Sequence, residues 1–281
     1  MIERDHTSLP IDRQCRLLGK SRSWYYYRPY KSAERTEADE RDKERILEVK
    51  EDIPFYGYRK VALEIAERYG VPMTDKRTYR LWHELGLKAL RLPPPTSTPR
   101  TAHAVYPYLL KNREITYPNQ VWETDITYLR LPQGIVYLCA IIDVYSRKVL
   151  SWNLSNTMDV MLVLWPLTWA LEQYGCPEII NTDQGSQYTT EDWISMVEDL
   201  GIRVSMNGKN RSLDNIYIEQ WWKSFKYEDF YLNQYEKIKE LRAGIEKYVQ
   251  FYNTRRFHQQ LENWRPDEVY FTQQQKLQEA S

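Results

Sequence analysis

Three acidic residues in separate parts of the chain could together hold a metal ion. They are Asp125 in "WETDITY", Asp183 in "NTDQGSQYTT" and Glu219 in "SLDNIYIEQWWKSFKYE". Magnesium prefers oxygen ligands, which carboxylates on rigid elements can provide. Such a set suits the cutting or joining of a phosphodiester, because two divalent cations about 4 Å apart can activate the attacking oxygen and stabilise the leaving one. Taken alone, however, Asp183 is better explained as a turn-forming residue at a strand end.

The surroundings of Glu219 favour a site over a solvated surface. Glu219, Trp222, Lys223 and Lys226 occupy positions i, i+3, i+4 and i+7, so they share one face of a predicted helix. A solvated Glu–Lys pair is the common alternative for this spacing. The neighbouring residues are too apolar for an exposed helix, so we expect Glu219 to point into a site and the two lysines to meet DNA phosphates. Those apolar neighbours are Ile216, Ile218, Trp221 and Phe225.

Other polar residues are weaker candidates for chemistry. Glu123 shares a strand face with Asp125, but it lacks a second partner. His258 in "YNTRRFHQQL" is expected to position DNA or to pack a helix, because a metal-activated water needs no imidazole. Two further sites are expected to be structural: Asp143 at a strand end, and Asp214 with Asn215 as the N-cap of the Glu219 helix.

The segments that carry these residues predict an α/β fold with a mixed five-stranded sheet and flanking helices. Asp183 ends one of these strands, and strand ends beside a switch in strand order form natural sites. The predicted strands are 121–131, two within 135–155 with a turn near Tyr145 and Ser146, 177–183 and 202–206. The predicted helices are 159–175, 190–201 and a helix from about Leu213 to Tyr227.

The N-terminal part predicts small all-α helix-turn-helix units. In residues 11–28 a helix reaches Gly19, and Ser21 can cap a second helix. In residues 56–87 two apolar helical stripes are separated by "YGVPMT". An ordinary helical hairpin would give the same pattern. We expect DNA contacts from three basic residues at the start of the second of these helices: Lys76, Arg77 and Arg80.

Charge is distributed unevenly, although the net charge of the 281 residues is zero. Residues 1–113 carry 23 Lys and Arg against 16 Asp and Glu, and the remaining residues carry the opposite imbalance. A basic first part predicts polyanion binding there. The most apolar helical stretch, 160–171, is too short to span a bilayer, and the N-terminus lacks the apolar core of a signal peptide. We expect a cytoplasmic protein without a membrane partner.

The three cysteines are few and show no paired spacing. Cys15, Cys139 and Cys176 are expected to be buried thiols of a reduced compartment, and a structural zinc is not expected.

Four prolines within "RLPPPTSTPR" mark the clearest boundary in the chain. The predicted divisions are an N-terminal helix-turn-helix-like unit at 1–40, a second helix-turn-helix domain at 41–92, a Pro-rich linker at 93–117, a catalytic core at 118–230 and a C-terminal helical tail at 231–281.

The motifs resemble those of a known family. "WETDITY", "NTDQGSQYTT" and "SMNGKNRSLDNIYIEQWWKSFKYE" resemble the three acidic motifs of the DDE transposases and retroviral-type integrases, and 35 residues separate Asp183 from Glu219. The tail "YVQFYNTRRFHQQLENWRPDEVY" is similar to the ending of the IS-three group of insertion-sequence transposases, in the protein made from the second reading frame. "FYGYRKVALEIAERYGVPMTDKRTYRLWHELGLK" is similar to the helix-turn-helix module of that group.

The resemblance implies a ribonuclease H-like core with Asp125, Asp183 and Glu219 as a triad for Mg2+, two ions per site, with Mn2+ as a substitute. It implies hydrolysis at the element ends, then transesterification by the freed 3′-hydroxyl, usually through a circular intermediate. The implied partners are terminal inverted repeats, target DNA, further copies of the chain on paired ends, and a helix-turn-helix and leucine-zipper protein from the upstream frame. The tail residues expected to contact DNA are Arg255, Arg256 and His258.

The chain departs from many relatives at positions that are not ligands. Asn181 and Thr182 stand where many have His-Ser, and Ile216 stands where many have a small residue. The His/Cys zinc domain of retroviral integrases is absent, so end recognition would fall to the helical units. Two alternatives stay open: a catalytically silent DNA-binding regulator derived from a transposase, and a stand-alone nuclease with the same fold.

Overall fold

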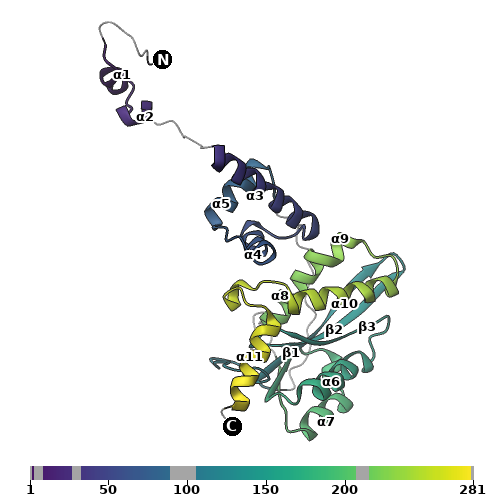
Figure 1. Cartoon of the computed structure of the whole chain (residues 1–281). Helices are drawn as coiled ribbons and strands as arrows, with labels where there is room; N and C mark the ends of the chain where they lie inside the picture. Colours follow the sequence, from purple (N-terminus) through teal and green to yellow (C-terminus); the bar gives the residue numbers. More distant parts are fainter. Residues whose placement is uncertain (1, 3–8, 27–32, 89–105, 207–214, 280–281) are drawn as a thin grey trace. The chain divides into compact units, whose positions relative to one another are not determined.

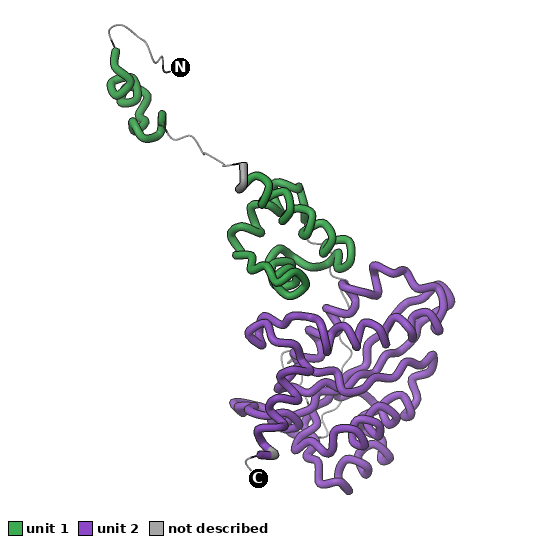
Figure 2. Tube along the Cα trace, viewed as in Figure 1, with its two compact units in different colours: residues 1–90 green, residues 91–281 purple. Residues whose placement is uncertain are grey.

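A computed structural model describes residues 2, 9–26, 33–88, 106–206 and 215–279. The chain divides into two compact units, Met1–Leu90 and Arg91–Ser281 (Figure 2). Most of the Pro-rich segment, and the predicted helix start at Leu213 and Asp214, lie outside the described residues.

The first two helices form as the sequence predicts. Helix α1 (Ile11–Leu17) ends before Gly19, which adopts a left-handed conformation with φ +62°. Helix α2 (Arg22–Tyr26) begins after Ser21, whose Oγ accepts a hydrogen bond from the backbone N–H of Trp24 at 3.2 Å. A left-handed residue favours glycine because it has no Cβ, and a serine at the N-cap satisfies a free N–H.

Three further helices pack on one another in the first unit. They are α3 (Ala33–Asp52), α4 (Tyr58–Tyr69) and α5 (Asp75–Glu84), the last two in the order that the apolar stripes predict. Gly70 in a left-handed conformation ends α4, and the side chain of Thr74 accepts from the N–H of Arg77 to cap α5. The sequence did not predict α3, whose residues are mostly charged. Helix α3 runs across residues 40 and 41, where the sequence places the boundary between the first two domains. The domain boundaries stay a prediction.

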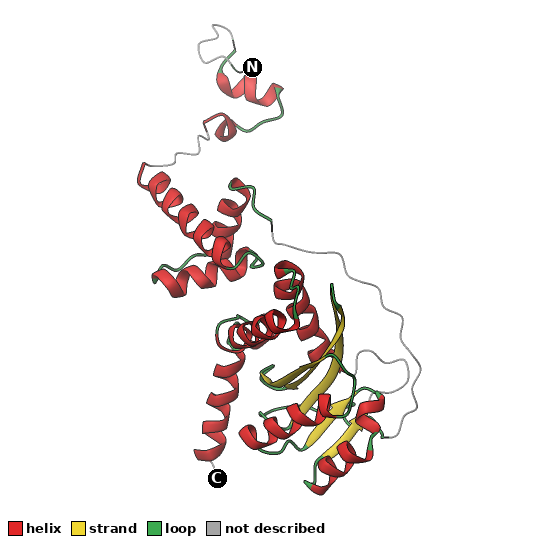
Figure 3. Ribbon diagram, turned by 90° about the vertical axis from the view of Figure 1, so that its right-hand side faces the viewer, coloured by secondary structure: helices red, strands yellow, loops and turns green. Residues whose placement is uncertain are grey.

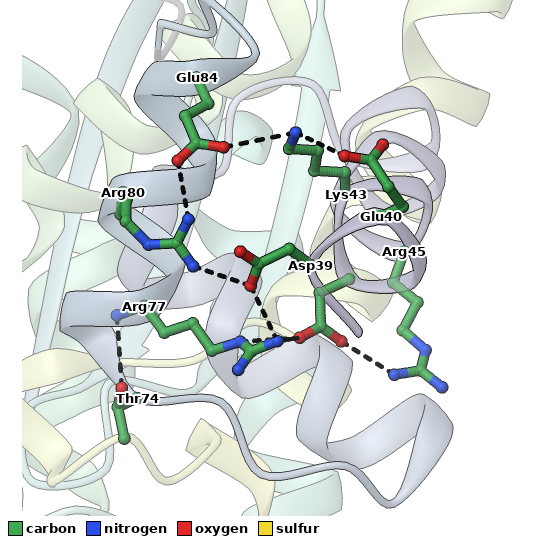
Figure 4. A network of polar contacts seen from close by, with 9 residues as sticks. Asp39, Glu40, Lys43, Arg45, Thr74, Arg77, Arg80 and Glu84 are labelled. Atoms are coloured by element: carbon green, nitrogen blue, oxygen red, sulfur yellow. Dashed lines mark hydrogen bonds and ion pairs between the residues drawn. The ribbon is translucent and has the colours of Figure 1, made fainter. Parts of the chain in front are cut away.

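A polar network joins α3 to α5, and we call it the α3–α5 network (Figure 4). Oδ1 of Asp39 accepts from the Nη2 atoms of Arg77 and Arg80, at 3.1 and 2.8 Å. The Asp42 carboxylate lies 2.8 Å from Nη2 of Arg77, and its other oxygen accepts from Arg45 at 3.0 Å. The rim is formed by Arg80 with Glu84 and by Lys43 with Glu40 and Glu84. Asp39 and Asp42 are only 2% and 6% exposed, so the two central carboxylates are withdrawn from water while the basic residues around them stay partly exposed.

The second unit is built on a mixed sheet with helices packed around it (Figure 3). Its five strands lie in the order β3-β2-β1-β4-β5. Strands β1, β2 and β3 are antiparallel neighbours, and β4 and β5 continue the sheet parallel to β1. The ribonuclease H-like fold class that the sequence predicts is therefore confirmed. The strands are β1 (Val121–Leu131), β2 (Gly134–Asp143), β3 (Val149–Ser155), β4 (Ile179–Thr182) and β5 (Arg203–Met206).

Helices cover both faces of this sheet, with α8 and α10 on one side and α6 and α7 on the other (Figure 1). Successive strand residues point to opposite faces, so β1 sends Leu129 to the first side and Trp122 to the second. The helical elements of this unit are α6 (Met161–Tyr174), η1 (Ser186–Thr189), α7 (Glu191–Asp199), α8 (Ile216–Phe225), the π-helical η3 (Lys226–Phe230), α9 (Tyr231–Asn233), α10 (Ile238–Thr254), η4 (Gln259–Leu261) and α11 (Pro266–Glu279).

The prediction for the cysteines is partly wrong. Cys15 and Cys139 are buried, but Cys176 is exposed, because it lies in the loop between α6 and β4 and not on a packed element. Within the part of the chain that the structure describes, no helix is long and apolar enough to cross a membrane.

The α3–α5 network should stabilise the first unit. Arg80→Ala removes one of two arginines bound to buried Asp39, and we expect a loss of about 2 kcal/mol, below the 3–5 kcal/mol typical of a broken buried pair because Arg80 is partly exposed. The Arg77→Ala/Arg80→Ala double variant should lose more than the sum of the single losses, since it removes both arginines that pair with Asp39. Urea-dependent hydrogen exchange of α3 and α5 peptides in the full chain measures these losses, and strict additivity would contradict the expected coupling.

Candidate active site

Asp125 lies in the middle of β1 and faces helix α8. Its Oδ2 accepts a hydrogen bond from Nε1 of Trp222 at 2.9 Å. Burial raises the pKa of the Asp125 carboxyl well above its ordinary value, and the negative charges of Asp183 and Glu219 raise it further, while the Trp222 donor opposes this rise. The structure therefore brings the three predicted acids close enough for the other two charges to act on Asp125.

Strand β1 and the α8 region meet in a repeating register. The Glu123 carboxylate accepts from the N–H of Ile218, Asp125 accepts from Trp222, and Oγ1 of Thr127 accepts from Nζ of Lys226 at 2.7 Å. Each step is two residues on the strand and four on the helix. Two strand residues span about 6.6 Å and four helical residues about 6.0 Å. Because these lengths are similar, the strand and the helical segment keep the same register over all three contacts.

Glu123 caps the N-terminus of α8, a role that the sequence did not predict. Its Oε2 accepts from the backbone N–H groups of Tyr217 and Ile218, at 3.1 and 2.9 Å. Asn215 occupies the predicted N-cap position, but its side chain makes no cap bond and instead bonds Asn181 and the carbonyl of Thr124. The free N–H groups of a helix start attract a carboxylate from any nearby element. The sequence signal that could have indicated this role is the alternation that places Glu123 and Asp125 on one face of the strand.

Asp183 follows β4 directly, as predicted. Its Oδ1 accepts from the backbone N–H of Gly185 at 2.9 Å. A Cβ atom on Gly185 would stand only 2.8 Å from that same oxygen. Glycine at position 185 thus leaves the space that the Asp183 carboxylate occupies. Burial raises the pKa of Asp183 above its ordinary value.

The side chain of Glu219 reaches solvent, and its expected direction into a site stays a prediction. Its side chain is exposed, because the buried face of α8 is formed by Ile218, Trp221, Trp222 and Phe225, and Glu219 lies beside that face. Its pKa is nevertheless raised by partial burial, and its charge acts on Asp125. Glu219 therefore borders the site from the solvent side.

The donor set fits a divalent cation by its chemistry. Three carboxylates come from a strand, a strand end and a helix, and hard cations prefer such oxygen ligands. Burial and mutual repulsion raise the pKa of Asp125, and a cation would relieve that repulsion. Among the described residues, however, no three His, Cys, Asp or Glu side chains are already gathered as a metal-binding cluster. Holding a metal would require the Glu219 side chain, which is exposed, to adjust.

The residues predicted to contact DNA lie in different environments. Lys76, Lys223 and Arg255 are exposed. Arg77 and Arg80 belong to the α3–α5 network, and Lys226 is hydrogen-bonded to Thr127. Their DNA contacts stay predictions.

The tail residues Arg256 and His258 lie within the fold. Arg256 is buried and pairs with both oxygens of Glu228, and its Nη2 also donates to Ser224. The His258 ring packs on Tyr252, with centroids 4.7 Å apart. These contacts join the segment after α10 to η3 and α8.

Asp143 is structural, as predicted. Its carboxylate accepts from the backbone N–H groups of Asn119 and Ser146 and from Oγ of Ser146, so it closes the turn between β2 and β3.

Models of three protein domains match this chain. Integrase core domain models match residues 116–212 and 200–266. An HTH-like domain model matches residues 37–94.

Two curated relatives are similar over most of the chain. InsK for insertion sequence element IS150 of Escherichia coli strain K12 is 30% identical over 264 residues, which cover 92% of this chain and 93% of InsK. The insertion element IS600 uncharacterized 31 kDa protein of Shigella sonnei is 32% identical, with 90% and 95% covered.

Solved structures are similar at lower identity. The HTLV-2 integrase catalytic core domain in complex with magnesium has a TM-score of 0.45 and 18% identity, covering 55% of this chain and 97% of that one. A chain of the simian T-cell lymphotropic virus intasome in complex with PP2A regulatory subunit B56 gamma has a TM-score of 0.48 and 16% identity, covering 80% and 74%.

Glu123 should make the stability of the second unit depend on pH. Burial raises the pKa of Glu123 to about 8, against an ordinary value of 4.5, although the Ile218 N–H and the Arg147 charge lower it. Between these values the folded state keeps a proton that the unfolded state has released, so stability falls as pH rises, by at most about 1.4 kcal/mol per pH unit. Glu123→Gln should flatten the curve of urea unfolding free energy between pH 5 and 8. Equal slopes in both proteins would contradict the shift.

Proposed function

We propose the function of this chain from its family: it belongs to the IS-three group of insertion-sequence transposases, which carry an integrase-type catalytic core. Such a chain is a polynucleotidyl transferase that serves insertion-sequence transposition. We propose further that it cleaves DNA at the ends of its element and joins the freed strand to a new site, with Asp125, Asp183 and Glu219 as the metal-binding triad.

The observation that carries this proposal is the electrostatics of Asp125. A half-buried carboxylate beside two other negative charges is unfavourable unless a cation neutralises it, and such perturbed groups cluster at functional sites. The acids come from β1, the end of β4 and α8, so three rigid elements position them. A turn-former or a solvated pair would not explain the effect of two further carboxylates on the pKa of Asp125.

The proposed chemistry has two balanced steps. In the first, a water oxygen attacks phosphorus at the element end, a new P–O bond forms, the P–O3′ bond breaks, and the 3′ oxygen leaves as a hydroxyl. In the second, that hydroxyl attacks another phosphodiester, so one P–O bond again replaces another and no external energy source is needed. Mg2+, two ions per site or Mn2+ in its place, would supply activation of the attacking oxygen and stabilisation of the leaving oxygen.

The protein's own groups position this site. The indole N–H of Trp222 holds the Asp125 carboxylate in one orientation, and the Gly185 N–H does the same for Asp183. Lys223 is exposed one turn after Glu219 and is placed to contact a DNA phosphate. The proposed partners are the terminal inverted repeats, target DNA, further copies of this chain on paired ends, and the upstream-frame protein.

Asp183→Asn should abolish cleavage and joining while leaving DNA binding intact, because it removes a ligand charge and keeps the side-chain shape. The assay incubates full-length protein with Mg2+ and labelled duplexes covering the DNA that flanks its gene, and resolves nicked and joined strands on denaturing gels. We expect a loss of more than about 100-fold. Asp199→Asn, which changes an exposed acid at the end of α7, is the matched control and should stay active.

Three outcomes would contradict this assignment. Wild-type protein that binds flanking DNA but never cuts or joins it with Mg2+ or Mn2+, with or without the upstream-frame protein, would be a silent regulator. Cleavage of any duplex without joining would indicate a nuclease. An active Asp183→Asn variant would remove Asp183 from the triad.

Gly185→Ala should impair the same reaction by displacing Asp183. The added methyl would meet the Asp183 carboxylate at 2.8 Å, so we expect cleavage to fall roughly 10-fold to 100-fold with little change in melting temperature. The neighbouring Ser186→Ala variant loses only an exposed hydroxyl contact and serves as control. Wild-type activity in Gly185→Ala would show that Asp183 does not depend on this space.

A further inference from the structure

The basic residues of α5 fall into two groups with different surroundings. Arg77 and Arg80 lie on the side that faces α3 and are bound into the α3–α5 network. The opposite side carries Lys76, Tyr79 and His83, which we call the α5 outer face. These three residues follow one another at i, i+3 and i+7, so they form one line along the helix.

Arg77 and Arg80 are poorly suited to bind DNA, because both are paired with carboxylates of the protein. In the α3–α5 network four cations, Lys43, Arg45, Arg77 and Arg80, meet four carboxylates, Asp39, Glu40, Asp42 and Glu84 (Figure 4). The charge of the network is therefore balanced within the protein. Turning either arginine toward a phosphate would leave a nearly fully buried aspartate with less positive charge beside it, which is costly.

The residues of the α5 outer face take no part in the α3–α5 network. Lys76 is exposed, and among the described residues it makes no ion pair. Tyr79 is 49% exposed, and its ring packs edge-on against Tyr58 at 5.1 Å and against His83 at 4.4 Å. One exposed cation and two rings with polar edges, aligned on a helix, offer hydrogen-bond donors and acceptors to a partner.

Double-stranded DNA is the partner that this face fits. Helix α5 has ten residues, a length of about 15 Å, and a single helix of that size enters a major groove about 12 Å wide. Lys76 and Tyr79 lie in its N-terminal half, where recognition helices contact base edges. Asp75, the acid of the first turn, lies 3.3 Å from the Arg59 guanidinium, so its charge is offset at this end of the helix.

We propose that the α5 outer face reads the DNA end in the major groove, while Arg77 and Arg80 hold α5 against α3 and do not contact the DNA. Lys76 donates to a phosphate or a base edge, and the hydroxyl of Tyr79 and the imidazole of His83 read base edges. This assignment rests on the proposed function, because it specifies how that function finds its ends. It replaces two of the DNA contacts that the sequence predicts with Tyr79 and His83.

The test measures fluorescence anisotropy of full-length protein with overlapping duplexes that cover the DNA flanking its gene, against shuffled duplexes of the same composition. Lys76→Ala should weaken binding and lower the slope of log affinity against log salt by about 0.9. Tyr79→Leu and His83→Ala should each reduce the preference for the flanking duplex roughly fivefold to a hundredfold. Lys43→Ala removes the same charge as Lys76→Ala, but from α3, and should bind as wild type.

A second variant separates structure from contact at Arg80. Asp39→Leu/Arg80→Met replaces the Asp39–Arg80 pair by apolar side chains of similar volume and leaves the net charge unchanged. Arg77 keeps Asp42 and Glu84 keeps Lys43 as partners, so the unit should stay folded. Hydrogen exchange of α3 and α5 in the full chain checks the fold. Affinity and preference for the flanking duplex should equal those of wild type within about twofold.

Each other outcome overturns the proposal in a distinguishable way. Loss of DNA affinity in a folded Asp39→Leu/Arg80→Met protein would make Arg80 a DNA contact. Wild-type preference in all three outer-face variants would exclude this face as a DNA reader, and if those variants instead lost self-association by light scattering, the face would bind a second copy of the chain. In both cases end cleavage by wild type would leave the proposed function standing, whereas a wild type that shows neither preference nor cleavage would remove both.

Discussion

Helix α8 lies along β1 because two residues of an extended strand and four residues of an α-helix cover nearly the same length. That match lets Glu123, Asp125 and Thr127 each meet a residue of the helical segment in turn. Apolar residues beside these contacts, such as Leu129 and Trp221, pack together on the same face. A shift of α8 by one residue would rotate it by about 100° and separate Glu219 from the charge of Asp125. The rest of the candidate site depends on this register.

Two groups of carboxylates in this chain differ in the charges around them. In the first unit, Asp39 and Asp42 meet arginines, so their charge is neutralised and the contact stabilises the helices. In the second unit, burial raises the pKa of both Glu123 and Asp125, and the negative charges of neighbouring acids raise the pKa of Asp125 further. A neutralised group holds a structure together, whereas a carboxylate left short of positive charge has affinity for a cation.

The strands, α4 to α7 and the helix that carries Glu219 could be predicted because each has a local signal: alternation, an apolar stripe, a cap or a glycine. Helix α3 could not, since charged residues occupy most of its length and its few buried apolar residues, such as Ile46 and Val49, form no continuous stripe. Local patterns are limited in the same way near the site, where contacts between distant residues decide what each side chain meets. Glu219 has apolar neighbours in sequence, yet the helix turns them toward the sheet and leaves Glu219 at the edge. Glu123 caps a helix 94 residues away, and no local pattern reports that contact.

By itself, the sequence determined the strands and most of the helices but not α3, the family to which the chain belongs, and the three acids that are candidates for the chemistry. These follow from residue types at short spacing, where backbone geometry sets which side chains share a face. Only the tertiary structure decided what each polar side chain binds: Trp222 on Asp125, Glu123 on the start of α8, and Arg80 on Asp39. Such pairs join residues far apart in the chain, and their partners depend on how strands and helices pack in register, which short-range patterns do not encode.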